Sequence, residues 1–280
     1  MTKIIAVANQ KGGVGKTTTS VNLGACLAKM RRKVLLVDLD PQANATVGCG
    51  VERERINHSA YSVLLGEATV SEASIHTDCG VDVLPSEPSL AGIQVELTSE
   101  TDRDVRLRAA LLETRQYDFV LIDCPPSLNV LTINALVAAD GVLIPVQCEY
   151  YALEGLSGLL ETITRVRQRS NPSLAIEGLL RTMFDGRNSL SNEVSEQLHR
   201  HFGDKVFRTV VPRNVRLAEA PSYGKPVIDY DQHCIGAKAY LALAGELVGS
   251  RSQPLSNDDV TGLSAEENGA SNPLGTTTKW

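Results

Sequence analysis

The sequence predicts an α/β fold in which a mostly parallel, twisted sheet carries helices on both faces. Two observations favour this fold. Short apolar runs rich in β-branched residues alternate with amphipathic stretches of helical period, a pattern typical of buried strands joined by crossover helices. The chain of 280 residues, 42% of them hydrophobic, is also long enough to bury a sheet between two helical layers.

The individual elements follow from these runs in chain order. In the helix expected over 152–169, for example, Leu156, Ile163 and Val166 share one face and the arginines fall mostly off it. The expected strands cover residues 3–9, 33–38, 81–86, 118–123, 141–147, 176–184 and 205–212. The expected helices cover residues 16–30, 102–115, 129–139, 152–169, 190–202 and 236–248.

The composition divides the chain into one domain over residues 1–249 and a tail over 250–280. The tail has almost no large apolar residue and no periodicity, so we expect it to be disordered. No window approaches the roughly 20 consecutive apolar residues that a membrane span needs. The first residues, MTKIIAVAN, show neither a charged n-region nor a cleavage site, so no export signal is expected.

The six cysteines are scattered, with no CxxC pair and no histidine cluster beside them. This spacing disfavours a zinc site or an iron–sulfur cluster. Because no export signal is expected, the cysteines are best interpreted as reduced thiols that serve as small apolar residues.

The charge is unevenly distributed. The whole chain has a net charge of −6, which by itself does not indicate nucleic-acid binding. The range from Arg165 to Arg216, however, contains ten Lys and Arg residues and five Asp and Glu residues, which gives a local charge of +5. One face of an acidic protein could therefore still bind a polyanion.

Residues 8–20, ANQKGGVGKTTTS, lie between an expected strand and an expected helix, which is the context of a phosphate-binding loop. Glycines let backbone N–H groups converge on phosphate oxygens, and the helix N-terminus adds partial positive charge. Lys16 would reach the β and γ phosphates, and the Thr17 hydroxyl would ligate Mg²⁺. We therefore predict a P-loop NTPase that uses ATP and Mg²⁺. The loop residues expected to contact the nucleotide are Lys11, Gly12, Gly13, Val14, Gly15, Lys16, Thr17 and Thr18.

The loop departs from the general pattern GxxxxGK[ST], because Gln10 occupies the first glycine position and a second lysine, Lys11, follows it. Here the chain resembles the deviant-Walker ATPases with KGGxGK[ST], which include ParA/Soj and MinD proteins, nitrogenase iron protein and arsenite-pump ATPases. The resemblance implies that Lys11 reaches across a nucleotide-sandwiched homodimer to the partner subunit's ATP. A cation delivered in this way stabilises the charge of the transition state. The alternative is a solvated loop cation.

Carboxylates follow two expected strands at the edge of the sheet where ligands bind in open α/β folds. Alternation puts Asp38 and Asp40 on one side of the chain, so one can serve Mg²⁺ while the other positions the attacking water. Asp123 ends an apolar strand, a Walker B pattern. We therefore expect Thr17, Asp38 and Asp123 around the metal. By resemblance, DLDPQAN is similar to switch I of ParA/Soj proteins, in which the second aspartate, here Asp40, is required for hydrolysis.

Three later segments, 145–156, 179–194 and 211–231, resemble ParA/Soj proteins specifically. The resemblance runs from Lys3 to about Gly249. It implies a Mg²⁺-dependent ATPase that is slow unless a partner and DNA stimulate it. The residues that it implies in catalysis are Lys11, Lys16 and Asp40, and those that it implies beside the adenine are Pro212 and Asn214.

The resemblance also implies that the ATP dimer binds double-stranded DNA without sequence preference. The matching positions are Arg187 and Arg216, with Arg213 a further candidate. Arginines from two subunits would neutralise several phosphates, so the affinity would fall steeply with salt. The structural alternative is that Arg213 or Arg216 pairs with Glu219 or Asp229 and only holds a loop.

The expected function is therefore chromosome or plasmid segregation by a cytoplasmic, nucleoid-associated ATPase with a ParB/Spo0J-type partner. Two alternatives stay open. One is a MinD-like or cargo-positioning ATPase that acts on a membrane or a protein assembly, although the tail lacks an amphipathic membrane helix. The other is a biosynthetic P-loop enzyme that phosphorylates or amidates a small substrate.

Overall fold

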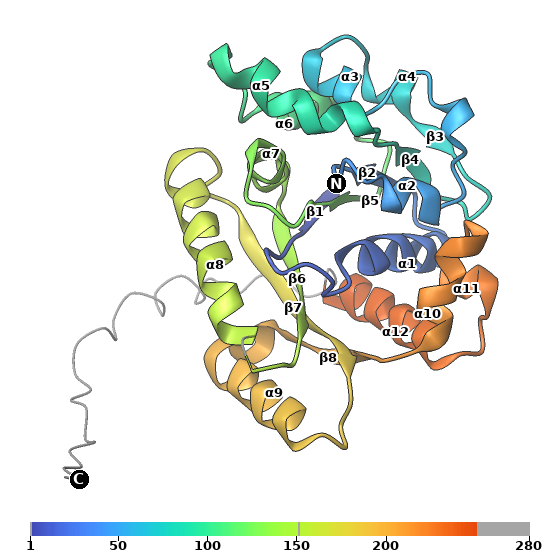
Figure 1. Ribbon diagram of the computed structural model, residues 1–280, viewed down its shortest axis with the longest axis vertical. Helices are drawn as coiled ribbons and strands as arrows, with labels where there is room; N and C mark the ends of the chain where they lie inside the picture. The colour runs from blue at the N-terminus through green and yellow to red at the C-terminus, as the bar shows by residue number, and fades with distance from the viewer. Residues whose placement is uncertain (1, 151, 251–280) are drawn as a thin grey trace, which may run out of the picture.

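The computed structural model describes residues 2–150 and 152–250 and contains one eight-stranded sheet (Figure 1). Its strands are β1 (Lys3–Val7), β2 (Val34–Asp38), β3 (Ile75–His76), β4 (Asp82–Leu84), β5 (Phe119–Asp123), β6 (Gly141–Gln147), β7 (Ala175–Phe184) and β8 (Val206–Pro212). The order across the sheet is β3-β4-β2-β5-β1-β6-β7-β8. Every neighbouring pair is parallel except β3 and β4. The predicted α/β fold is confirmed. Among the strands only the two-residue β3 was missed, and the short helices outside the six predicted ranges were missed as well.

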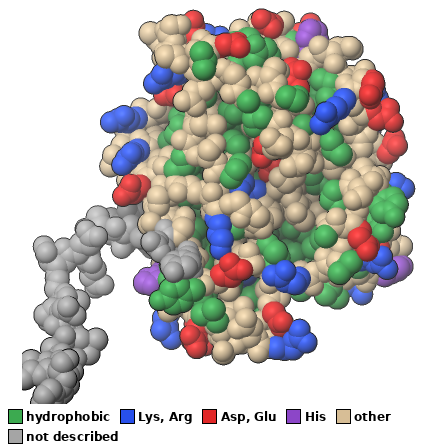
Figure 2. All heavy atoms as spheres, in the orientation of Figure 1, with side chains coloured by type: hydrophobic (Ala, Val, Ile, Leu, Met, Phe, Trp, Pro, Cys, Tyr) green, Lys and Arg blue, Asp and Glu red, His purple; other side chains and the backbone are tan. Residues whose placement is uncertain are grey.

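Helices cover both faces of this sheet (Figure 1). They are α1 (Lys16–Lys29), α2 (Asn44–Gly48), α3 (Ala60–Leu65), α4 (Val70–Ala73), α5 (Ile93–Glu96), α6 (Arg106–Ala110), α7 (Val130–Ala138), α8 (Ala152–Arg169), α9 (Ser189–Phe202), α10 (Val215–Glu219), α11 (Val227–Tyr230) and α12 (Ile235–Ser250). Helices α1, α2, α11 and α12 share one buried cluster, and α3 to α9 contribute to the other. Figure 2 shows acidic and basic side chains around the rim of this face and also in its middle.

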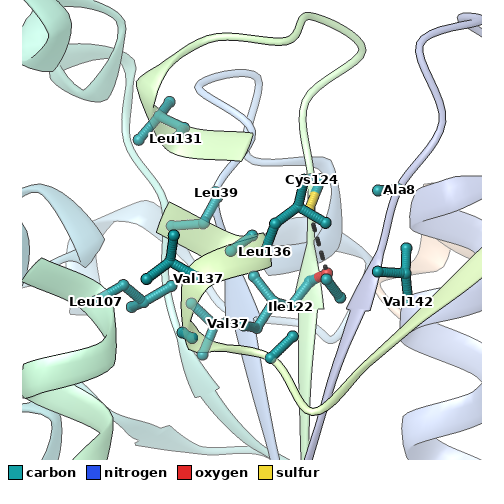
Figure 3. Packing of buried hydrophobic residues seen from close by; sticks show 14 of the residues in the cluster. Ala8, Val37, Leu39, Leu107, Ile122, Cys124, Leu131, Leu136, Val137 and Val142 are labelled. Atoms are coloured by element: carbon teal, nitrogen blue, oxygen red, sulfur yellow. Dashed lines mark hydrogen bonds between the residues drawn. The ribbon is translucent and has the colours of Figure 1, made fainter. Parts of the chain in front are cut away.

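Alternation along the central strands builds the two cores. In β1, Ile5 and Val7 belong to the cluster under α1 and α12, whereas Ala6 points to the opposite cluster. Figure 3 shows that second cluster, where Val37 and Ile122 lie against residues of α7. The central strands β2 and β5 are buried along their whole length, so burial of their apolar residues on two faces stabilises the sheet.

The helix predicted over 102–115 is wrong in its length. Only Arg106–Ala110 is α-helical, and a short 3₁₀ turn follows it. The buried amide of Asn134 on α7 explains the late start, because its Oδ1 accepts from Leu107 N at 3.0 Å and its Nδ2 donates to Arg103 O at 2.7 Å. The backbone before α6 is therefore bonded to α7 instead of to a preceding helical turn.

Three further expectations concern the chain as a whole. All six cysteines are free, and five of them are buried, in agreement with their interpretation as small apolar residues. Within residues 2–150 and 152–250, no helix is both long enough and apolar enough to span a membrane. The predicted tail lies outside the described residues, except for Ser250 at the end of α12.

Two glycines let the end of α2 contact the 3₁₀ turn at Ala220–Tyr223. Gly50 has φ +79°, and a Cβ atom there would lie 2.8 Å from Gly224 O; Gly224 itself has φ +60°. We expect Gly50→Ala to lower the free energy of unfolding by about 2 kcal/mol or more, because it adds left-handed backbone strain to a clash with a carbonyl. Urea denaturation measures the change.

The matched control is Gly245→Ala in α12, where an added Cβ would meet nothing within 4 Å. There alanine should raise the stability by about 0.5–1 kcal/mol through its helix propensity. Equal denaturation midpoints for the two variants would contradict the close contact between Gly50 and Gly224.

Candidate functional site

A cavity of about 450 Å³ opens where the loop between β1 and α1 meets the ends of β7 and β8. Its position at the carboxyl ends of parallel strands is where open α/β folds bind ligands. The residues that line it are Gly12, Gly13, Gly15, Lys16, Thr17, Thr18, Asp40, Asn44, Pro126, Thr182, Met183, Val211, Pro212, Arg213, Asn214, Leu217, Ala218 and Tyr240. The structure thus brings together most of the predicted loop residues with the two that were expected beside the adenine.

The loop has the backbone of an anion cradle. Gly13 and Gly15 adopt φ +75° and +87°, and a Cβ atom on Gly12 or Gly13 would meet nothing within 4 Å. Gly15 caps α1, a helix of 14 residues, so the N–H groups of its first turn face the loop. Val14 is the exception, because it is buried and its carbonyl accepts from the Thr182 hydroxyl at 2.8 Å. It contributes to the loop through its backbone.

The Lys16 ammonium is buried at this cradle. The residue is only 7% exposed, and its Nζ donates to Lys11 O at 3.3 Å. Burial lowers the pKa of Lys16, while the nearby carboxylates of Asp123 and Asp40 act in the opposite direction. A buried cation of this kind is stabilised by an anion that enters the cavity.

Lys11 lies apart from this cradle. Its ammonium pairs with the Glu149 carboxylate at 2.7 Å, and the two side chains are 38% and 49% exposed. It does not line the cavity of its own chain. The two lysines of the loop therefore point to different places, Lys16 inward and Lys11 toward solvent.

Asp123 sits beneath the loop at the end of β5. It is fully buried, and its two oxygens accept from the Thr17 hydroxyl at 2.8 Å and the Ser20 hydroxyl at 2.9 Å. Burial raises the pKa of the Asp123 carboxyl, and the neighbouring Asp38 raises it further. A cation close to Thr17 would relieve this unfavourable burial of negative charge. Ser20 was not among the predicted residues, although it follows Thr17 at helical spacing.

Asp38, like Asp123, is a predicted metal ligand that does not line the cavity. Its Oδ2 accepts from the backbone and the hydroxyl of Thr46 at 2.8 and 2.7 Å, and its Oδ1 accepts from Asp40 N at 3.1 Å. Burial raises its pKa. The expected alternation fails because β2 ends at Asp38, and the turn that follows directs Asp40 alone into the cavity.

The donor set suits Mg²⁺ better than a metal held wholly by protein. Among the described residues, no cluster of three His, Cys, Asp or Glu side chains could hold a metal ion. Mg²⁺ commonly takes only one or two protein ligands and completes its shell with water and phosphate oxygens. The adjacent Thr17 and Asp123 fit that requirement.

The far wall of the cavity was only partly predicted. Asn214 caps α10 by accepting from Arg216 N at 2.9 Å, and Arg213 beside it is exposed and also lines the cavity. Thr182 and Met183, at the end of β7, were missed as lining residues. Met183 has φ +48°, an uncommon conformation for a non-glycine residue.

The other two predicted DNA residues, Arg187 and Arg216, are also exposed and form ion pairs within the chain. Arg187 binds Asp185 through two nitrogens, each at 2.9 Å. Arg216 lies 2.8 Å from Glu219 and 3.5 Å from Asp231. The alternative that Arg216 only holds a loop is therefore met in part, because Arg216 pairs with Glu219 as expected and with Asp231. Asp229, the other expected partner, pairs with Lys29. Such exposed pairs are weak enough to be exchanged for phosphate contacts.

Comparisons with known proteins agree on one family. Residues 2–176 match the family model described as an AAA domain. The chain is 55% identical over 249 residues to the sporulation initiation inhibitor protein Soj of Bacillus subtilis, covering 88% of this chain and 98% of the relative. It is 53% identical over 250 residues to the chromosome partitioning protein ParA of Caulobacter vibrioides, covering 88% and 94%.

A solved structure is also similar. It is the cobyrinic acid a,c-diamide synthase of Mycobacterium smegmatis with bound ADP and magnesium, at 38% identity and a TM-score of 0.79 over 90% of this chain and 96% of that one.

Proposed function

The chain belongs to the ParA/Soj family of chromosome-partitioning ATPases, and from this membership we propose that it is an ATP-dependent dimeric switch. In this proposal it binds ATP with Mg²⁺, dimerises around two nucleotides and coats double-stranded DNA without sequence preference. A ParB/Spo0J-type partner then stimulates hydrolysis and releases the dimer, which moves a chromosome or plasmid. The protein would act in the cytoplasm, on the nucleoid.

The main support for the proposal is that the two lysines of the loop lie in different places. Lys16 is buried in the cavity, whereas Lys11 is half exposed and pairs with Glu149 outside it. An enzyme that worked as a monomer would need only the first. A solvent-facing ammonium beside a phosphate cradle is suited to the nucleotide of a second subunit.

Each residue has a role that its position allows. The glycine loop binds the phosphates through backbone N–H groups, and Lys16 holds the β and γ phosphates by charge. Thr17 and Asp123 would hold Mg²⁺, which when bound neutralises phosphate charge. Asp40, half exposed in the cavity, would position the attacking water. Pro212 and Asn214 would contact the adenine.

The pair between Lys11 and Glu149 predicts an effect on assembly. If Lys11 must leave the carboxylate to reach the partner's ATP, Glu149→Gln should favour the dimer. An exposed pair contributes about 0.5–1 kcal/mol, so half-maximal dimerisation should need about two- to fivefold less ATP. Light scattering across an ATP titration measures this. In a Lys11→Ala background the same substitution should have no effect. Weaker dimerisation would instead mean that Glu149 aids the bridging position of Lys11.

Co-sedimentation tests the function directly. With ATP and Mg²⁺, the protein should bind plain DNA of any sequence and not anionic lipid vesicles, and ADP should abolish DNA binding. Binding to vesicles but not to DNA would favour a MinD-like or cargo-positioning role and overturn the proposal.

Arg216→Glu should separate DNA binding from dimerisation. We expect it to weaken DNA binding by about 10- to 100-fold and to flatten the salt dependence, since each subunit loses about one phosphate contact. The ATP dimer should persist in light scattering. The control is Arg200→Glu, another exposed arginine, which pairs with Glu196 on α9. If both variants bind DNA like the parent, Arg216 only holds its loop.

A second candidate is favoured by the name of the similar structure, a diamide synthase. On this alternative, ATP turnover would require a small carboxylic acid and an amine donor and would ignore DNA. We prefer the partitioning role because the ParA and Soj relatives are 53% and 55% identical to this chain, whereas the diamide synthase is 38% identical. ATP turnover measured with DNA, or with a corrinoid acid and glutamine, distinguishes the two.

A further inference from the structure

A second, larger cleft lies away from the nucleotide cavity, between α5, α7 and α8. Its volume is about 670 Å³. The residues that line it are Gln94, Thr98, Arg103, Asp104, Leu128, Asn129, Val130, Ile133, Thr162, Arg165, Val166, Arg169 and Ser170. None of the roles proposed above uses these residues, so the cleft needs its own explanation.

The cleft is basic. Three arginines and one aspartate line it, which gives a net charge of +2. Arg103 lies 3.8 Å from Asp104, and Arg165 lies 3.3 Å from Glu161. For Arg169 no partner is found among the described residues. Figure 2 shows basic side chains at the left edge of this face, over the end of α8 in Figure 1.

The cleft is also preformed and partly apolar. The buried Asn134 holds the backbone of Arg103 at 2.7 Å, and Arg108 on α6 donates to Ser170 O at 3.2 Å. Leu128 in the wall is 38% exposed, and Val130 and Ile133, which also line the cleft, are only partly buried. Arginines next to exposed apolar side chains suit a segment that carries both carboxylates and aliphatic residues.

The chain itself carries such a segment after α12. Between residues 252 and 278 there is no Lys or Arg, and two acidic pairs, Asp258–Asp259 and Glu266–Glu267, give a charge of −4. Leu255, Val260 and Leu263 are interleaved with these pairs. The acidic pairs in residues 255–267 therefore complement the arginines of the cleft, and the aliphatic residues complement its apolar side chains.

The described chain ends near one end of the cleft, the end formed by Ser170. Glu246, one turn before the end of α12, accepts from Arg208 N and Thr209 N near the start of β8. Ser170 in the cleft lies just before β7, the neighbour of β8. Helices α12 and α8 pack on opposite faces of the sheet, so the tail has to pass around the sheet to reach the cleft. Asp258 can reach about 26 Å from Ser250, and Glu266 about 53 Å.

We propose that residues 255–267 of this chain dock into the arginine-lined cleft of the same molecule. The acidic pairs contact Arg165 and Arg169, and the aliphatic residues cover Leu128 and Ile133. Because Leu128 and Asn129 follow Asp123 by a few residues, an occupied cleft would touch the segment that leaves the candidate metal site. The proposal does not depend on the ATPase function.

Zero-length carbodiimide coupling in the full chain tests the docking. Arg165→Lys with Arg169→Lys keeps the charge and adds amines to the cleft, and Arg200→Lys adds one amine at a matched exposed site on α9. Residues 252–279 form one tryptic peptide, so its amide links are identified by mass. We expect coupling of the tail to positions 165 and 169 to exceed coupling to position 200 by roughly tenfold or more. The yield should not depend on protein concentration, because the reaction is intramolecular. The coupling should be lost in about 1 M salt.

Hydrogen exchange supplies a second readout. Replacing the four acidic residues (Asp258→Asn, Asp259→Asn, Glu266→Gln and Glu267→Gln) should speed exchange in residues 127–133 and 165–170 of the otherwise unchanged chain. Equal coupling at all three positions, or unchanged exchange, would overturn the proposal. Coupling that rises with protein concentration would also overturn it, because the tail would then dock in a neighbouring molecule.

Discussion

Lys11→Ala is expected to bind ATP and to remain a monomer. The substitution leaves Lys16, the glycine backbone and Thr17 in place around the cavity, so the nucleotide keeps its cradle. What disappears is the solvent-facing ammonium, which in the parent pairs with Glu149 at 2.7 Å. On the proposed mechanism this ammonium is the contact that makes the dimer depend on ATP. A transition-state cation supplied in trans contributes about 10³–10⁵ to the rate, so stimulated hydrolysis should fall by at least about a thousandfold.

Fluorescent-nucleotide binding and light scattering measure the two halves of this prediction separately. Lys16→Ala is the matched control, because it removes the other ammonium of the same loop and should abolish nucleotide binding itself. A Lys11→Ala variant that still dimerises with ATP would return Lys11 to the role of a solvated loop cation.

The sequence was informative wherever local pattern alone decides the structure. Parallel strands buried on two faces read as continuous apolar runs, and all seven predicted strands are present. The phosphate loop was equally visible, because the left-handed φ angles of Gly13 and Gly15 require glycine at fixed spacing.

Features that depend on distant residues were not visible. Lys11 and Glu149 are 138 positions apart, and Thr182 bonds Val14 across 168 positions. The helix predicted over 102–115 was shortened by Asn134, a polar residue that nothing nearby in sequence marks as a backbone partner. The expectation that Asp38 and Asp40 share one side of the chain failed because strand alternation was extended to Asp40, two residues past the end of β2. The error in the helix arises where a tertiary hydrogen bond overrides a local preference, and the error at Asp40 arises where a strand ends earlier than expected.

Asp40→Ala is expected to keep the ATP dimer and to lose hydrolysis. The carboxylate lines the cavity beside Thr17 and is the one aspartate of its segment that faces it, since Asp38 is bonded to Thr46. General-base or water-positioning groups contribute about 10²–10⁴ to the rate. Single-turnover phosphate release should therefore slow by about that factor. Because hydrolysis is the proposed route of release, the variant should also stay on DNA after the partner protein is added.

Asp40→Asn separates the chemical role of this residue from its structural one. In the parent, Oδ1 of Asp40 accepts from Gln42 N at 3.0 Å and shapes the turn after β2. Asparagine keeps an acceptor for this bond but has no negative charge. If the charge positions water, the asparagine variant should hydrolyse as slowly as the alanine variant while the turn is preserved. If asparagine instead restores the parent rate, the turn and not the carboxylate is what hydrolysis requires, and another group must orient the water.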